Sequence, residues 1–181
     1  ADGGPELLWE ADVNRPARGW YNPVDCFMLD EVVSSAERHG LHLQLVMLTR
    51  DLYMSALKDP SSRDYDRAIS DARKLMRYAV ARWGYSTSVA AWEYWNEMDP
   101  GLPTDRFYAS VGEFLEDADV YRHLRATSAW GPSRRDCQHP KLDLADTHFY
   151  LRPSDAARLE DEVEAVRSEE RRVGKECRSR W

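Results

Sequence analysis

Asn96 and Glu97 end an aromatic-rich run, Trp92-Glu93-Tyr94-Trp95, and turn residues follow them at Asp99-Pro100-Gly101. This pattern predicts a buried strand over 92–97 with a carboxylate at its C-terminal tip. In a parallel α/β sheet, the loops at that end surround a ligand while the packed strands fix the geometry. A carboxylate placed there can act as a general acid or base. Glu97 is therefore the lead catalytic candidate, and a turn or helix-initiating carboxylate is its plain structural alternative.

Helices and strands are predicted to alternate along most of the chain. Helices are expected over 23–39, from about 62 to 83, over 104–118 and from 154 onward, and strands over 41–48, 92–97, 124–130 and 142–150. The stretch 131–141 is expected to be a loop with room for a short helix. Such alternation favours an α/β fold with a parallel sheet. Four strands cannot close a (β/α)8 barrel, which needs about eight, so the expected fold is a partial TIM barrel.

Two details of this pattern concern packing and ligand contact. On the first helix, one apolar stripe is expected to face inward: Phe27, Met28, Val32, Val33 and Ala36. Trp130, at the end of its predicted strand, is a candidate for stacking on a sugar, because aromatic faces pack against the apolar C–H faces of sugar rings.

Composition narrows the classes of function. The net charge of −7 argues against a nucleic-acid partner. The longest apolar stretches fall far short of the roughly 20 residues that span a bilayer, so no membrane span is expected. Three cysteines without a Cys-x-x-Cys pair, and histidines without metal-ligand spacing, indicate neither a disulfide framework nor a metal site. No cofactor is expected.

The last stretch, 167–181, differs from the rest in being rich in arginine and lysine. It resembles the in-frame translation of a sequencing-library adapter. We therefore expect an artefactual or disordered tail at 167–181, and one domain over 1–166.

Several motifs together resemble the clan A glycoside hydrolases, specifically the cellulase and β-mannanase-like enzymes of family 5. The resemblance covers roughly 21–153, and its motifs are Arg77-Tyr78-Ala79-Val80-Ala81-Arg82-Trp83-Gly84-Tyr85-Ser86, Ala91-Trp92-Glu93-Tyr94-Trp95-Asn96-Glu97, Tyr121-Arg122-His123-Leu124 and Asp146-Thr147-His148-Phe149-Tyr150. The resemblance implies a carbohydrate substrate, with Glu97 as the general acid/base and Asn96 on the sugar 2-hydroxyl. It also places His148 and Tyr150 around a second carboxylate. His148 has a plain alternative as a hydrogen-bonded core or loop residue.

By this resemblance the chain supplies barrel strands three to six. The nucleophile of the family is a glutamate on strand seven, and the chain leaves the family pattern at Val166. We therefore expect a catalytically incomplete fragment of a retaining glycoside hydrolase that cleaves a β-linked polysaccharide or oligosaccharide. The rival interpretation is a noncatalytic carbohydrate-binding or scaffold module on the same fold. A nucleotide-binding doubly wound fold is disfavoured, because no glycine-rich loop follows any strand.

Overall fold

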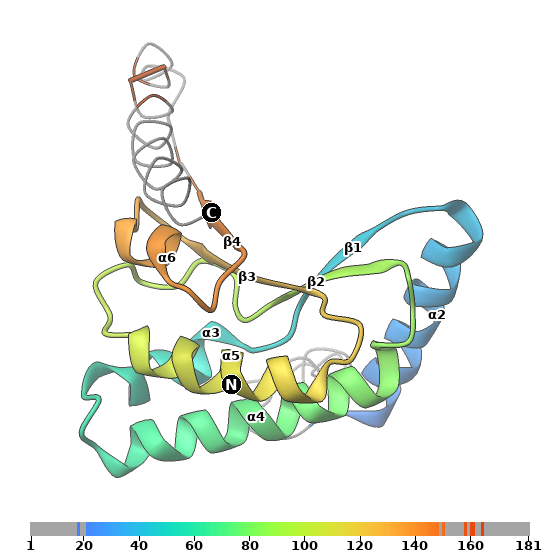
Figure 1. Ribbon diagram of the computed structural model, residues 1–181, viewed down its shortest axis with the longest axis horizontal. Helices are drawn as coiled ribbons and strands as arrows, with labels where there is room; N and C mark the ends of the chain where they lie inside the picture. The colour runs from blue at the N-terminus through green and yellow to red at the C-terminus, as the bar shows by residue number, and fades with distance from the viewer. Residues whose placement is uncertain are drawn as a thin grey trace, which may run out of the picture.

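The computed structural model describes Arg18, residues 21–148, Tyr150, Arg158, Glu160, Asp161 and Glu164. In this part of the chain, helices and strands alternate as predicted, which defines an α/β fold (Figure 1). The elements in chain order are α2 (Pro23–His39), β1 (Leu43–Val46), α3 (Arg50–Met54), the 3-10 turn η1 (Ala56–Lys58), α4 (Arg63–Trp83), β2 (Val89–Glu93), α5 (Asp105–Ala118), β3 (Leu124–Ala129), α6 (Arg134–Gln138) and β4 (Leu144–Thr147). Of the predicted last helix, the structure describes Arg158, Glu160, Asp161 and Glu164, and the 167–181 tail lies outside the described residues.

The four strands form one sheet in the order β1-β2-β3-β4, and all three neighbouring pairs are parallel. Consecutive strands are therefore neighbours, and each connection between them contains a helix. Parallel pairing brings the carboxyl ends of all four strands to the same edge of the sheet. The short helix α6 occupies the stretch where the sequence predicted a loop with room for one.

Capping residues set the ends of α2 where the sequence predicted them. The Asn22 side chain accepts a hydrogen bond from the backbone N–H of Val24 at 2.8 Å, and Pro23 stands at the first helical position. Gly40 ends the helix with φ at 64°, a left-handed conformation that glycine adopts without strain.

The inward face predicted for α2 is partly wrong. Val33 and Ala36 are buried, but Phe27 and Met28 are 61% and 63% exposed, and Val32 is 49% exposed. The rotation of α2 follows a polar contact instead of its apolar stripe.

That polar contact joins α2 to α4 through Asp30. Arg82 donates from Nε and Nη2 to the two carboxylate oxygens at 2.9 and 2.6 Å, and the Trp83 indole N–H donates to Oδ1 at 2.8 Å. The hydrogen bond from Arg82 holds the pKa of Asp30 below its ordinary value. A bidentate pair of this kind fixes the face that α2 turns toward α4.

Aromatic rings fill the layer between the sheet and the helices. Figure 1 shows α4 and α5 side by side below the sheet. Tyr94 and Trp95, from the end of β2, pack against Phe107 and Tyr108 of α5, and the Trp95 and Phe107 ring centroids are 4.6 Å apart. All four side chains are fully buried, so this layer holds α5 against the sheet.

The opposite face of the sheet is polar and concave. Gln44 of β1 donates from Nε2 to Glu93 Oε2 at 2.9 Å and to Asp146 Oδ2 of β4 at 3.2 Å. Neighbouring strands lie about 4.8 Å apart, so a flat sheet would put β1 and β4 roughly 14 Å apart. A single glutamine reaches across the intervening strands only because the sheet curls. Glu93 is 5% exposed and its carboxylate is hydrogen-bonded to Gln44, whereas only Leu45 of β1 is buried.

No helix in the described ranges is long and apolar enough to cross a bilayer. The expectation of no membrane span agrees with this finding.

The loop from α5 to β3 is organised by one buried carboxylate, Asp119. Its oxygens accept hydrogen bonds from the Trp92 indole N–H at 3.0 Å, from the backbone N–H of His123 at 3.0 Å and from that of Tyr121 at 3.2 Å. His123 Nδ1 lies 2.8 Å from Oδ2. Asp119 is 2% exposed, so its loss leaves buried donors without a partner.

We expect Asp119→Ala to lower the free energy of unfolding by about 3 kcal/mol, because removing one partner strands several buried polar groups. Urea denaturation followed by tryptophan fluorescence measures the change. Asp117→Ala is the matched control, since Asp117 is an exposed carboxylate near the end of the same helix. Equal stability of the two variants would contradict the role of Asp119.

Candidate active site

Glu97 lies in a turn beyond β2, not on the strand tip that the sequence predicted. The regular strand ends at Glu93. Tyr94 and Trp95 still form backbone hydrogen bonds with Ala126 and Ser128 of β3, and the chain bends at Asn96 and Glu97. The chain rejoins β3 at Met98, whose backbone N–H donates to Ser128 O at 2.8 Å. Glu97 itself has φ at 59°, a left-handed conformation that is rare for a residue with a side chain.

Three side chains from three different segments contact Glu97. His148 Nδ1 lies 2.8 Å from Oε1, and Arg50 Nη1 lies 3.5 Å from Oε2. Arg50 Nη1 also donates to the Glu97 backbone carbonyl at 2.9 Å, while the Glu97 backbone N–H donates to Ser128 Oγ at 2.9 Å. The Glu97 side chain is only 15% exposed. Both the carboxylate and the backbone of Glu97 are thus held.

The parallel sheet brings these contacts together. Arg50 begins α3 shortly after β1, Ser128 lies near the end of β3, and His148 follows β4 directly. The backbone N–H of His148 donates to Ala129 O at 2.9 Å, which continues the β3–β4 pairing past the strand. All of these residues therefore lie at the carboxyl edge of the sheet, where the sequence predicted a site.

Asn96 is exposed and borders a shallow cavity of about 420 Å³ at the end of β1. Arg50 and Asp51 line the same cavity. The Asn96 amide oxygen lies 3.5 Å from Ser128 Oγ. Asn96 therefore presents its side chain to solvent beside Glu97.

The two aromatic candidates differ in their surroundings. Trp130 is 40% exposed, and the Arg50 guanidinium lies over its ring at 5.4 Å from the centroid, so Trp130 lies beside the Glu97 contacts. Tyr150 is 75% exposed and takes no part in the hydrogen bonds that hold Glu97 within the described residues. Trp92 and Trp95 are fully buried, as expected for packing residues.

Ser128 is the residue that sequence reasoning missed. The one feature of the sequence that could have pointed to Ser128 is its type and place: it is a small polar residue one position before the end of β3, on the same face as Ala126. Arg50 follows the strand predicted over 41–48, but nothing in the sequence indicated that its side chain would contact Glu97.

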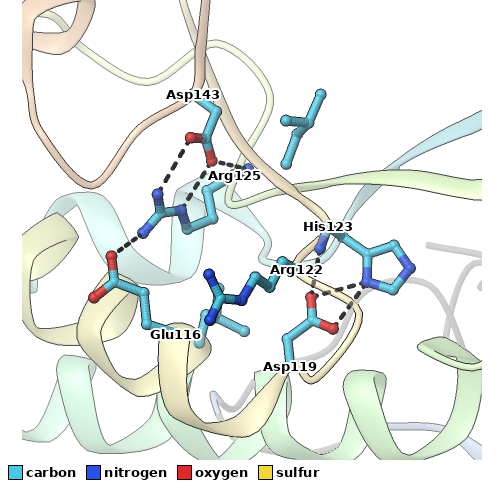
Figure 2. A pocket seen from close by; sticks show the side chains of 8 residues that line it. Glu116, Asp119, Arg122, His123, Arg125 and Asp143 are labelled. Carbon is cyan, nitrogen blue, oxygen red and sulfur yellow. Dashed lines mark hydrogen bonds and ion pairs between the residues drawn. The ribbon is translucent and has the colours of Figure 1, made fainter. Parts of the chain in front are cut away.

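A second cavity, of about 440 Å³, lies at the amino end of β3, away from Glu97 (Figure 2). Arg125 crosses it, donating from Nε to Asp143 Oδ2 at 2.9 Å and from Nη1 to Glu116 Oε1 at 2.8 Å. Burial would raise the pKa of Asp143, but hydrogen bonds from Arg125 outweigh it and hold the pKa below the ordinary value of 3.8. Hydrogen bonds from Lys141 and Arg125 likewise lower the pKa of Glu116 from 4.5.

These lowered pKa values predict an acid-sensitive contribution to stability. Because the folded state holds these protons less tightly than the unfolded chain, the contribution is complete above the ordinary carboxyl pKa and is lost as the pH falls below about 4. We expect Asp143→Asn to lower the unfolding free energy at pH 7, and we expect this difference from the wild type to shrink steadily as the pH falls below about 4. Denaturation at several pH values measures this. A difference that stays constant with pH would contradict it.

Glu97 and Arg122 are the two residues with side chains whose φ is positive in the described ranges. Arg122, at 57°, is exposed, and its backbone N–H donates to Asp119 O at 3.0 Å. Its side chain forms no hydrogen bond or ion pair within those ranges, which makes it a matched control for Glu97. We expect Arg122→Gly to raise the unfolding free energy by roughly 0.5 kcal/mol, because relief of left-handed strain exceeds the added freedom of the unfolded chain.

Glu97→Gly relieves the same strain but also removes the contacts with His148 and Arg50. We therefore expect a net loss of about 1 kcal/mol for that variant. Thermal and urea denaturation of the two variants side by side measures the difference. If Glu97→Gly is as stable as Arg122→Gly, the carboxylate contacts do not stabilise the fold.

The chain matches no family model, and no curated protein matches it. Within the residues that the structure describes, no group of three histidine, cysteine or acidic side chains is arranged to hold a metal ion.

Proposed function

We propose that this chain carries the acid/base side of the active site of a retaining β-glycoside hydrolase, built on part of a (β/α)8 barrel. The observation that carries the proposal is the Glu97 carboxylate, held 2.8 Å from His148 at the carboxyl edge of a parallel sheet. Catalytic groups of such barrels stand at that edge. The resemblance of the chain to family 5 cellulases and β-mannanases supports the same assignment.

The curvature of the sheet supports the barrel. The Gln44–Asp146 hydrogen bond joins the first strand to the fourth across the concave face, as the inward side chains of a barrel do. The helices α4 and α5 cover the other face, which is the position of the outer helical ring in that architecture.

Glu97 has the contacts that a residue needs when it must both give and take a proton. With the carboxylate ionised, the N–H of His148 at Nδ1 donates to Oε1; with the carboxyl protonated, its O–H donates to a neutral Nδ1. In glycoside cleavage, Glu97 gives its proton to the departing oxygen and later takes one from the attacking water.

The remaining roles follow the same geometry. Trp130 offers a partly exposed ring for a sugar face, and Asn96 offers an amide for a sugar hydroxyl next to Glu97. We place Tyr150, with His148, toward the second carboxylate. We place that second carboxylate, the nucleophile, outside the described residues on a strand that would follow β4.

An affinity label tests the proposal. An N-bromoacetyl glycosylamine of cellobiose or mannobiose carries an electrophile on a sugar and alkylates a carboxylate beside the sugar site. We expect competitor-sensitive labelling of Glu97, detected by peptide mass mapping and suppressed by excess cello- or manno-oligosaccharide. Glu97→Gln is expected to abolish labelling at position 97, and Trp130→Ala to weaken it about tenfold by loss of stacking.

Two controls sharpen the result. Glu113 is an exposed carboxylate on α5, away from this edge, so any labelling there should not respond to competitor. Tyr121→Ala removes an exposed aromatic ring at the other end of β3 and should leave labelling unchanged. If oligosaccharides bind but do not protect Glu97, the noncatalytic module is favoured; if none binds, the proposed substrate class is wrong.

A further inference from the structure

Ser128 holds the turn that carries Glu97 through three of its own atoms. Its backbone N–H donates to Trp95 O at 3.4 Å, and its carbonyl accepts from the backbone N–H of Met98 at 2.8 Å. Its hydroxyl oxygen accepts from the backbone N–H of Glu97 at 2.9 Å. Ser128 is 1% exposed, so water cannot readily take the place of its hydroxyl.

The hydroxyl contact matters because Glu97 has a left-handed backbone. At φ of 59°, a residue with a side chain is about 1–2 kcal/mol less stable than in the right-handed regions. Such a conformation persists only where the surroundings hold it. Without an acceptor for its N–H, the Glu97 backbone would relax toward negative φ, and that rotation would turn the side chain away from His148.

We propose that Ser128 is the positioning residue for Glu97: its hydroxyl holds the left-handed backbone that points the carboxylate at His148. The geometric part of this inference stands on the hydrogen bonds alone. Its consequence for catalysis rests on the proposed function.

Thr127 supplies a matched control on the same strand. Its hydroxyl is also buried, but it lies on the opposite face of β3 and is 3.1 Å from the hydroxyl of Tyr108 on α5. Removing it with Thr127→Val, which keeps the shape of the side chain, deletes a comparable buried hydrogen bond without touching the Glu97 turn.

The experiment records NMR spectra of the chain selectively labelled at histidine and glutamate. The ¹⁵N shifts of the His148 ring report which nitrogen holds the proton, and the amide proton shift of Glu97 reports its hydrogen bond. We expect Ser128→Ala to change both signals, Ser128→Thr to restore them by keeping the hydroxyl, and Thr127→Val to leave both as in the wild type.

Wild-type His148 and Glu97 signals in Ser128→Ala would overturn the inference, and so would a failure of Ser128→Thr to restore them. Equal changes in Thr127→Val would also overturn it, by showing a general loss of packing. If Ser128→Ala does not fold, Ser128→Cys replaces it, because sulfur is a weak acceptor of similar size. Intermediate shifts would then support the inference, and unchanged shifts would overturn it.

Labelling by the glycosylamine reagent separates this inference from the proposed function. We expect the rate of alkylation at Glu97 to fall on the order of 100-fold in Ser128→Ala, as for a misplacement of about 1 Å, and to recover in Ser128→Thr. If the NMR signals respond as expected but the wild type is never labelled, the proposed function fails and the positioning role of Ser128 stands. If labelling is competitor-sensitive but equal in Ser128→Ala, the positioning role fails.

Discussion

Parallel strand pairing is the constraint on which the rest of this structure depends. It brings the ends of β1, β2, β3 and β4 to one edge, so that Arg50, Ser128 and His148, which are far apart in the sequence, all lie within hydrogen-bonding distance of Glu97. Past the regular strands, backbone hydrogen bonds continue the pairing at Met98 and His148. The site is thus built on an extension of the sheet, and it is as rigid as that extension.

The buried aromatic layer allows the chain after β2 to leave regular strand geometry at the carboxyl edge of the sheet. Trp95 and Tyr94 anchor the end of β2 against α5, so the residues that follow leave the ladder from a fixed point. Asp119 holds the start of β3, because its carboxylate accepts hydrogen bonds from the Trp92 indole N–H and from the backbone N–H of His123, the residue before the strand. Near the end of the same strand, the Thr127 hydroxyl contacts the Tyr108 hydroxyl of α5, so Ser128 acts from a strand that is held at its start and near its end.

The sequence was sufficient for the order of elements because local signals agree with the fold. Asn22, Pro23 and Gly40 bound α2, and the apolar period of α4 gives its length. The sequence was insufficient for the rotation of α2, because that rotation depends on an ion pair between Asp30 and Arg82, two residues that are far apart in the chain. Periodicity placed Phe27 inward because it carries no information about such a pair.

The candidate site shows the same division. Glu97 and His148 could be found from strand ends and a family resemblance, and the structure does bring them together. The left-handed backbone of Glu97 could not be predicted, because glutamate has no local preference for it. Ser128 was missed for a related reason: its hydroxyl matters only because of the conformation of a residue on the neighbouring strand.

The amide of Gln44 has one further consequence. Its single NH₂ group serves two carboxylates, Glu93 and Asp146, that belong to strands separated by β3. The Asp146 carboxylate on β4 lies 3.2 Å from the Gln44 amide on β1 only because the sheet is curved. The side chain of Gln44 thus ties the first strand of the sheet directly to the last, in addition to the backbone ladder that joins each strand to its neighbour.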